Sequence, residues 1–205
     1  MLDQRLRQVK EDLLTPLIRG PLRRVHPDQV TWAAFGLGLG SALAASQGSF
    51  RLALGLWMAN RLMDGLDGTM ARVRKIQTDW GGYQDIVLDH VVYACIPLGI
   101  AWSSGKTEVL LACAVLQASY FVNTISWCFL SALLEKRAAE LVRSGQLTSV
   151  NMPAALIEGS ETFLFFLAFL LWPQWAGQGF WLMSLLVCWG VGQRWQIARH
   201  LLSKP

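Results

Sequence analysis

Long stretches without a charged residue are the feature that most limits what this chain can fold into. Residues 29–50, 109–134 and 162–193 contain no Asp, Glu, Lys or Arg. An apolar helix of about 20 residues matches the hydrocarbon thickness of a bilayer, about 30 Å. Of the 205 residues, 53% are hydrophobic and only 16% are charged, whereas soluble domains carry about 25% charged residues. We therefore predict an all-α, polytopic integral membrane protein.

The apolar segments predict a bundle of six transmembrane helices. Residues 162–193 would form a single helix of about 48 Å, which is too long for one crossing, so Pro173, Gly177 and Gly179 are expected to divide this segment. The second and third crossings have to accept charged residues, which are costly in a membrane and mark functional positions. The six predicted crossings are residues 29–50, 52–71, 82–103, 109–134, 155–172 and 176–198.

Residues 1–28 predict an arm ahead of the first crossing. Leu2, Leu6, Val9, Leu13 and Leu17 recur at helical spacing, with basic residues between them. A basic amphipathic helix before a membrane segment is expected to lie on the bilayer surface, although a solvated arm is the alternative. The chain is thus expected to comprise a cytoplasmic amphipathic arm, residues 1–28, and a membrane domain, residues 29–205.

The distribution of Lys and Arg predicts the orientation in the membrane. Fifteen of the 18 basic residues fall in the arm, in the loops after the second and fourth crossings, or in the tail. Cytoplasmic loops are enriched in Lys and Arg, so both termini are predicted to be cytoplasmic, in a cell or inner membrane. The net charge of +4 is explained by topology and attraction to anionic headgroups, and a nucleic-acid partner is not expected.

The second crossing carries a chemically unusual helical stripe. Asp64, Asp67, Gly68, Ala71 and Arg72 fall at i, i+3, i+4, i+7 and i+8, so they share one face of a helix. The two small residues would let a phosphate or ribose approach the helix backbone. The guanidinium of Arg72 is suited to bind a phosphate oxygen.

The third crossing presents a matching stripe. Gly81, Asp85 and Asp89 fall at i, i+4 and i+8, so two antiparallel helices would present two carboxylates each to one point near the cytoplasmic face. Four unneutralised carboxylates repel one another in a low dielectric, and divalent cations relieve this repulsion. Oxygen ligands without a Cys or His cluster favour magnesium, manganese or calcium over zinc.

The residues of these two stripes resemble a known family signature. The stretch DGLDGTMAR at residues 64–72, followed after eight residues by Gly81 and then by Asp85 and Asp89, matches the pattern D-x2-D-G-x2-A-R-x8-G-x3-D-x3-D. This pattern is typical of the CDP-alcohol phosphatidyltransferase family. All eight fixed positions are present, and the likeness also extends to the six-helix layout.

The resemblance implies a membrane-embedded enzyme of phospholipid biosynthesis, usually a homodimer, that transfers a phosphatidyl group from CDP-diacylglycerol to a small water-soluble alcohol and releases CMP. It implies two divalent cations, Mg or Mn, and an active site at the cytoplasmic face. The metal ligands would be Asp64, Asp67, Asp85 and Asp89, with Asp89 also acting as general base. The CDP moiety would be held by Gly68, Ala71, Arg72 and Gly81.

Thr31 is a further candidate for CDP binding. Pro27, Asp28 and Thr31 resemble a variant of the Pro-Asn-x-x-Thr often found at the start of this family's first membrane helix, with Asp28 in place of Asn. A helix N-cap explains Asp28 equally well.

The acceptor alcohol is less constrained by the sequence. Arg61 lies three residues before Asp64 and is interpreted either as part of the acceptor pocket or as the ion-pair partner of Glu158 or Glu161. The extra cations favour an anionic acceptor, with glycerol 3-phosphate first and inositol, its phosphate or serine as alternatives. The candidate acceptor-binding residues are Arg61, Arg74, Lys75 and Arg137.

A cation-coupled transporter is the alternative from another class. Such a protein would explain four intramembrane Asp residues, but it gives no reason for the Gly, Ala and Arg residues on the same stripe.

Overall fold

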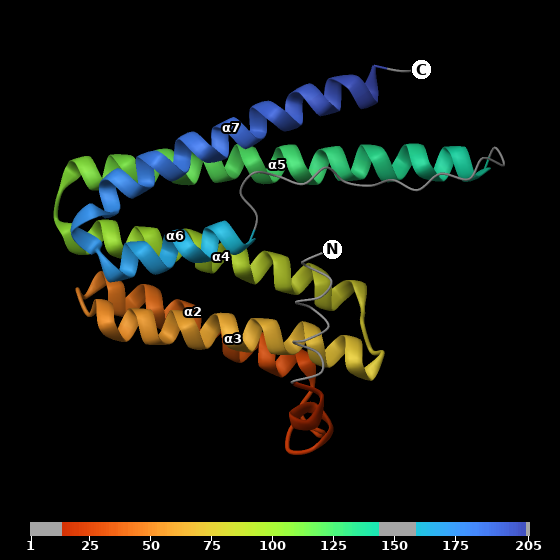
Figure 1. Ribbon diagram of the computed structural model, residues 1–205, viewed down its shortest axis with the longest axis horizontal. Helices are drawn as coiled ribbons and strands as arrows, with labels where there is room; N and C mark the ends of the chain where they lie inside the picture. The colour runs from red at the N-terminus through yellow and green to blue at the C-terminus, as the bar shows by residue number, and fades with distance from the viewer. Residues whose placement is uncertain (1–13, 144–158, 204–205) are drawn as a thin grey trace. The chain divides into compact units, whose positions relative to one another are not determined.

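The computed structural model describes residues 14–143 and 159–203, and the regular structure in these ranges is helical, without a strand (Figure 1). The all-α prediction is therefore confirmed for this part of the chain. Residues 1–13 of the predicted arm, and Glu158, lie outside the described residues. The chain divides into two compact units, Met1–Ser103 and Ser104–Pro205. The helices are α2 (Pro27–Ser46), α3 (Phe50–Arg74), α4 (Asp79–Ser104), α5 (Thr107–Arg143), α6 (Gly159–Leu171), the short 3-10 helix η1 (Pro173–Trp175) and α7 (Ala176–Leu202).

In the first unit, α2 and α3 form an antiparallel hairpin. The turn between them contains Gly48 at φ 75°, a left-handed conformation that glycine adopts without strain. Two buried polar side chains then join the helices, because Ser41 donates to the Ala53 carbonyl at 2.8 Å and Asn60 donates to the Ala34 carbonyl at 2.8 Å. Each contact satisfies a side-chain donor that would be costly to bury alone.

Small residues let the helices of this unit approach closely, as the glycines of the first crossing predict. Gly38 of α2 faces Val92 of α4, and Gly99 of α4 faces the Ala42 carbonyl of α2, so a Cβ atom at either glycine would clash. Gly36, in contrast, has open space on its Cβ side. Close packing by glycine is typical of helices in membranes, and here it brings α4 against the α2–α3 hairpin.

Residues before α2 pack on the end of this hairpin that is formed by the start of α2 and the end of α3. Ile18 is buried in a cluster with Val30 and Met70. Arg74 of α3 fixes the same segment by donating to the carbonyls of Leu22 and Val25, both at 2.6 Å, with the Ile18 carbonyl at 3.4 Å. The N-cap of α2 is His26, which leaves Asp28 in the first turn; the N-cap interpretation of Asp28 is therefore wrong by two residues.

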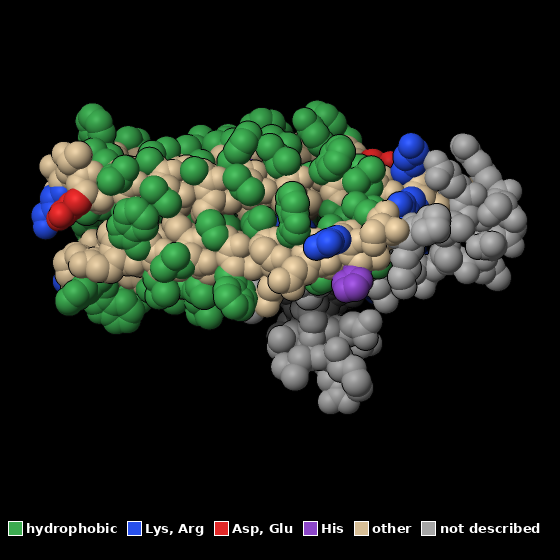
Figure 2. Space-filling view, turned by 90° about the horizontal axis from the view of Figure 1, so that it is seen from above, with side chains coloured by type: hydrophobic (Ala, Val, Ile, Leu, Met, Phe, Trp, Pro, Cys, Tyr) green, Lys and Arg blue, Asp and Glu red, His purple; other side chains and the backbone are tan. Residues whose placement is uncertain are grey.

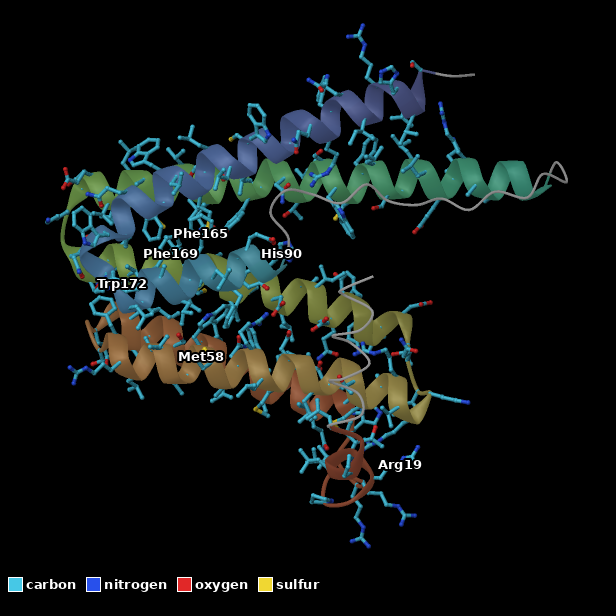
Figure 3. The ribbon with its side chains drawn as sticks, in the orientation of Figure 1. Arg19, Met58, His90, Phe165, Phe169 and Trp172 are labelled. Carbon is cyan, nitrogen blue, oxygen red and sulfur yellow. The ribbon has the colours of Figure 1, made fainter. Side chains whose placement is uncertain are left out.

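The second unit is held mainly by apolar packing. Phe169 of α6 meets Phe180 of α7 edge to face at 4.9 Å, and Phe165 lies beside Phe169 in Figure 3 with ring centroids 5.8 Å apart. Its main buried charge is Arg194 of α7, which donates to the backbone and side-chain oxygens of Asn123 at 3.2 and 3.0 Å.

The described helices support fewer membrane spans than the sequence predicts. Only α4 and α5 are each long and apolar enough to cross a bilayer, while α6 and η1–α7 qualify only together and are bent by 111°. Helix α3 does not qualify because Arg61, Asp64 and Asp67 lie close together within it. The described part of the chain thus gives two spans, or three if the bent pair is one. The count of six stays a prediction, although a helix lies at each of the six expected positions.

The surface of the helices agrees with a membrane environment. Figure 2 shows hydrophobic side chains over most of the face in view, with the charged side chains gathered mainly towards its ends. Large apolar residues such as Trp102, Leu185 and Trp195 are 67 to 75% exposed. Exposed apolar surface of this extent favours contact with lipid.

Candidate active site

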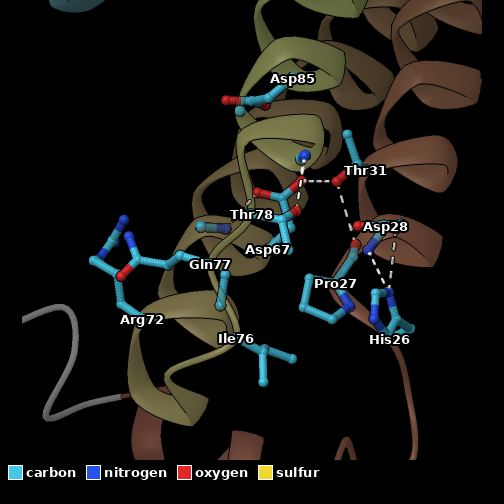
Figure 4. A pocket seen from close by; sticks show the side chains of 14 residues that line it. His26, Pro27, Asp28, Thr31, Asp67, Arg72, Ile76, Gln77, Thr78 and Asp85 are labelled. Atoms are coloured by element: carbon cyan, nitrogen blue, oxygen red, sulfur yellow. Dashed lines mark hydrogen bonds and ion pairs between the residues drawn. The ribbon is translucent and has the colours of Figure 1, made fainter.

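All the residues of the sequence motif line one or the other of two neighbouring cavities in the first unit. The larger, called here the polar cavity, has a volume of about 170 Å³ and lies between the start of α2, the second half of α3 and the start of α4 (Figure 4). It is lined by His26, Pro27, Asp28, Thr31, Asp67, Gly68, Ala71, Arg72, Ile76, Gln77, Thr78, Gly81, Gly82 and Asp85.

The smaller space, called here the inner cavity, measures about 10 Å³ and shares Thr31 and Asp85 with the polar cavity. Its other lining residues include Asn60, Asp64 and Asp89. The structure therefore brings the four predicted Asp residues to two adjoining spaces, and it places the five predicted CDP-binding residues on the polar cavity.

Asp67 is held by neutral donors. Its Oδ2 accepts a hydrogen bond from the Thr31 hydroxyl at 2.6 Å, and its Oδ1 accepts one from the Gly68 backbone N–H at 2.5 Å. The residue is only 5% exposed. Figure 4 shows Thr31 and Asp67 joined across the polar cavity. The hydroxyl of Thr31 is thus engaged with a carboxylate, a contact that the sequence motif does not predict.

Arg72 and the two motif glycines shape the wall of the polar cavity. A Cβ atom at Gly68 would lie 3.2 Å from Nη1 of Arg72, so the glycine leaves room for the guanidinium. Gly81 donates its backbone N–H to the Thr78 hydroxyl at 3.0 Å. Arg72 Nη2 donates to the Thr69 hydroxyl at 3.2 Å. The guanidinium therefore lies on the wall of a cavity that is large enough for a phosphate group.

Asp89 is held by a cation. Arg61 donates to both of its carboxylate oxygens, from Nη2 to Oδ1 at 2.5 Å and from Nη1 to Oδ2 at 3.1 Å. The hydroxyl of Tyr93 donates to the same Oδ2 at 3.2 Å. Arg61 also lies 3.4 Å from Asp64. A two-pronged pair of this kind is stronger and more directional than a single ion contact.

Arg61 pairs with two acids of the motif. Its ion pairs within the first unit are with Asp89 and Asp64, whereas Glu158 lies outside the described residues and Glu161 belongs to the second unit. One partly buried cation therefore balances part of the charge that the four Asp residues bring together.

The donor set suits a hard divalent cation. Asp64 interacts electrostatically with Asp85 and Asp89, and Asp67 with Asp85. Carboxylate oxygens are the ligands that Mg²⁺ and Mn²⁺ prefer. Within residues 14–143 and 159–203, however, no three Asp, Glu, His or Cys side chains are grouped closely enough to hold a metal ion as they stand. Arg61 on Asp89 and Thr31 on Asp67 occupy the oxygens that such an ion would bind.

The predicted acceptor cations differ in the contacts they make within their own units. Arg74 donates to the three backbone carbonyls before α2, and Lys75 is the exposed C-cap of α3 at φ 56°. In the second unit, Arg137 donates to the carbonyls of Leu201 and Leu202 at 2.8 Å each. Arg74 and Arg137 thus have clear structural partners.

Tyr93 and Asn60 are two residues outside the motif that contact the Arg61–Asp89 pair. Tyr93 lies four residues after Asp89 on α4, and this spacing is a signal that sequence reasoning could have used. Asn60 accepts from Arg61 Nε at 2.7 Å while donating to Ala34, and nothing in the sequence marks it beyond its place beside Arg61.

Comparison with known proteins agrees with the motif. The sequence profile described as CDP-alcohol phosphatidyltransferase matches residues 24–191. Inner membrane protein YnjF of Escherichia coli K12 is 32% identical over 166 residues, which is 80% of this chain and 78% of that protein. The bifunctional IPC transferase and DIPP synthase of Archaeoglobus fulgidus is 35% identical over 86 residues, 42% of this chain but only 17% of that protein.

Solved structures show the same fold. Phosphatidylinositol phosphate synthase PgsA1 of Mycobacterium tuberculosis with CDP-DAG bound superposes with a TM-score of 0.72 at 23% identity, covering 92% of this chain and 94% of that chain. The same protein in complex with manganese and citrate gives a TM-score of 0.71, also at 23% identity, covering 90% of this chain and 88% of that one. Since the family profile spans most of the sequence, and the Escherichia coli relative is 32% identical over 80% of this chain, this chain belongs to the CDP-alcohol phosphatidyltransferase family.

Proposed function

We propose that this transferase moves the phosphatidyl group of CDP-diacylglycerol to the hydroxyl of a small water-soluble alcohol and releases CMP. The observation that carries the proposal is the placement of four carboxylates, Arg72 and the motif glycines around two adjoining cavities. The Mycobacterium tuberculosis protein of the same fold is described with CDP-DAG bound, which supports the choice of donor.

The CDP moiety is assigned to the polar cavity. Gly68, Ala71 and Gly81 leave its wall without long side chains, so a pyrophosphate can approach the backbone of α3 and α4. Arg72 supplies a charge-assisted contact to a phosphate oxygen. Thr31 holds Asp67 in place at the same wall.

Asp89 is assigned as the general base. The acceptor oxygen attacks the phosphorus that carries diacylglycerol, its proton passes to a carboxylate oxygen of Asp89, and the bond to the bridging oxygen breaks as CMP leaves. A carboxylate at hydrogen-bond distance from the attacking hydroxyl is the geometry that this step requires.

Asp64, Asp67, Asp85 and Asp89 are assigned to hold two divalent cations, Mg or Mn. When bound, these ions would neutralise the pyrophosphate and the charge that develops on CMP. The manganese in the Mycobacterium tuberculosis structure supports a divalent cation for this fold.

The acceptor remains to be chosen by experiment among chemically related alcohols. Arg61, Arg74 and Arg137 are engaged by the protein, so three of the four cations that favoured an anionic acceptor already have partners. Glycerol 3-phosphate is the first acceptor to test. Inositol phosphate is next, since the neighbours of the same fold are phosphatidylinositol phosphate synthases, followed by inositol and serine.

We further propose an inner-membrane homodimer with cytoplasmic termini and the site at the cytoplasmic face. The positive-inside distribution and the inner-membrane relative support this placement. Tags after Pro205 and between Arg137 and Ala139 are expected to be cytoplasmic, and a tag near Gly105 is expected to be external. A reversed side for any tag contradicts the six-crossing topology.

The deciding experiment measures CMP release by purified protein. It is given CDP-diacylglycerol, Mg²⁺ or Mn²⁺ and one acceptor at a time, and the lipid product is identified by mass spectrometry. CMP release that requires both metal and one acceptor supports the proposal. Its absence with every acceptor, or equal activity with a chelator, contradicts the proposal. Asp79→Asn, which changes an exposed acid in the first turn of α4 outside both cavities, is the matched control for variants of the motif.

A further inference from the structure

Asp89 differs from the other three motif acids in what surrounds it. Arg61 and Tyr93 together supply three hydrogen bonds to its two oxygens. Both of the bonds to Oδ2 come from these residues. A carboxylate offers about four acceptor positions, so Arg61 and Tyr93 leave one position, on Oδ1, that neither of them uses. Asp64 also lies within hydrogen-bond distance of Asp89. Because both oxygens are held, the carboxylate of Asp89 cannot rotate without breaking these hydrogen bonds.

Arg61 is itself fixed from the opposite side. Its Nε donates to Asn60, whose amide is anchored on the Ala34 carbonyl of α2. Its guanidinium carbon lies 4.7 Å from the ring centroid of Trp57 and 5.4 Å from that of Tyr93. Trp57 is fully buried and Asn60 is 1% exposed. The cation is therefore packed against two adjoining aromatic rings and held by Asn60, which favours a fixed over a mobile guanidinium.

The donor count of Arg61 argues against a phosphate contact. A guanidinium has five N–H groups. One is used by Asn60, and Nη1 lies within hydrogen-bond distance of Asp64, Asp89 and Tyr93. Nη2 gives one more to Asp89. At most one N–H is left, which is too few for the two-pronged contact that makes arginine an effective phosphate binder.

We infer that Arg61 and Tyr93 form a clamp that orients the carboxylate of Asp89, so that Oδ1 faces the reacting hydroxyl while Oδ2 is withheld. Arg61 is thus a positioning residue that acts through Asp89 and does not contact the acceptor. The inference rests on the proposed role of Asp89 as general base. It also explains why one acid of four is singled out for proton transfer, which the symmetric spacing of the motif does not.

The clamp is tested with three substitutions and one control. Arg61→Gln removes the charge and the two-pronged contact, Arg61→Lys keeps the charge alone, and Tyr93→Phe removes only the hydroxyl. Arg51→Gln is the control, because Arg51 is an exposed arginine on the same helix, outside both cavities.

The expected result is a loss of turnover at constant substrate affinity. Arg61→Gln should lower kcat about 100-fold, since a misplaced catalytic group costs about that factor. Arg61→Lys should lie between Arg61→Gln and wild type. Tyr93→Phe should lower kcat about fivefold, as expected for one lost hydrogen bond of about 1 kcal/mol. KM for CDP-diacylglycerol and for the acceptor should change less than about twofold in every variant.

A second readout does not depend on turnover. Arg61→Gln removes a positive charge beside Asp64 and Asp89, so Mn²⁺ should bind the purified protein several-fold more tightly, as measured by calorimetric titration. Arg51→Gln should leave Mn²⁺ affinity and kcat unchanged. If wild type releases no CMP with any acceptor, the proposed function fails, and the Mn²⁺ titration alone then tests whether Arg61 withholds Asp89.

Three results overturn the clamp. A strong rise in acceptor KM with unchanged kcat in Arg61→Gln would make Arg61 an acceptor contact. A lower thermal midpoint in detergent with normal kcat per folded molecule would make its role purely structural. Unchanged Mn²⁺ affinity, or no Mn²⁺ binding in any variant, also contradicts the inference. If Arg61→Gln does not fold, Tyr93→Phe decides, since normal turnover in that variant is incompatible with the clamp.

Discussion

The two ends of the acid cluster are built differently. At the polar cavity, Asp67 is held by a hydroxyl and a backbone N–H, both neutral donors. At the inner cavity, Asp89 is held by the guanidinium of Arg61 and by Tyr93. One end therefore has neutral hydrogen-bond donors on its carboxylate, while the other is paired with a positively charged side chain.

This difference separates two tasks that the motif treats alike. An acid held by neutral donors has no positively charged side chain that competes with a bound cation. An acid paired with an arginine has a fixed direction, and the arginine competes with a bound cation. Substitutions at the Asp67 end should therefore mainly raise the metal requirement, whereas substitutions at the Asp89 end should mainly lower turnover.

The largest expected effect is that of Asp89→Asn. An amide cannot accept the proton of the acceptor hydroxyl, so CMP release should fall about 1,000-fold or more, within the usual range for general-base catalysis. Binding of CDP-diacylglycerol should stay near that of wild type. The measurement is steady-state CMP release beside equilibrium lipid binding, with Asp79→Asn as control. More than a tenth of wild-type turnover would remove Asp89 as the base.

Asp67→Ala is expected to act on the metal requirement. It removes one ligand from the polar-cavity end, so the Mn²⁺ concentration for half-maximal activity should rise about 100-fold. The measurement is CMP release across a Mn²⁺ series from chelated to millimolar. Turnover lost equally at all Mn²⁺ concentrations would place Asp67 outside the metal site.

Thr31→Val should give a smaller change of the same kind. It keeps the shape of the side chain but removes the hydroxyl that holds Asp67, so the half-maximal Mn²⁺ concentration should rise about 10-fold. Thr31→Ser keeps the hydroxyl and serves as the matched control. A rise in the KM for CDP-diacylglycerol at saturating Mn²⁺ would instead support the direct contact to CDP that the sequence suggests.

The helices and the acid cluster could be predicted from the sequence for a simple reason. A fixed helical period places Asp64 and Asp67, and then Asp85 and Asp89, on one face each. The partner of Arg61 could not be predicted in this way, because several acids lie within reach of an arginine and only the packing of α3 against α4 selects Asp89. The N-cap of α2 could not be predicted from the sequence either, because both His26 and Asp28 are able to cap a helix and the structure uses His26.

The number of membrane spans is open for another physical reason. Apolar length alone identifies α4 and α5, but the charged residues that the proposed active site requires on α3 also lower the hydropathy of this helix. A site built inside a membrane domain thus weakens the signal by which its own helices are found.

The smallest expected effect on activity is that of Arg74→Gln, which tests whether a predicted acceptor cation is structural. Arg74 donates to the carbonyls of Leu22 and Val25, and these contacts attach the segment before α2 to α3. Loss of these charge-assisted bonds should destabilise the protein by about 2 kcal/mol, seen as a lower thermal midpoint in detergent. The acceptor KM should change less than about twofold. Lys75→Gln removes the neighbouring exposed charge without such bonds, so its thermal midpoint should equal that of wild type. If Arg74→Gln raises the acceptor KM while its thermal midpoint stays unchanged, Arg74 contacts the acceptor. The acid cluster would then need a third, acceptor-binding region beside the Asp67 end and the Asp89 end.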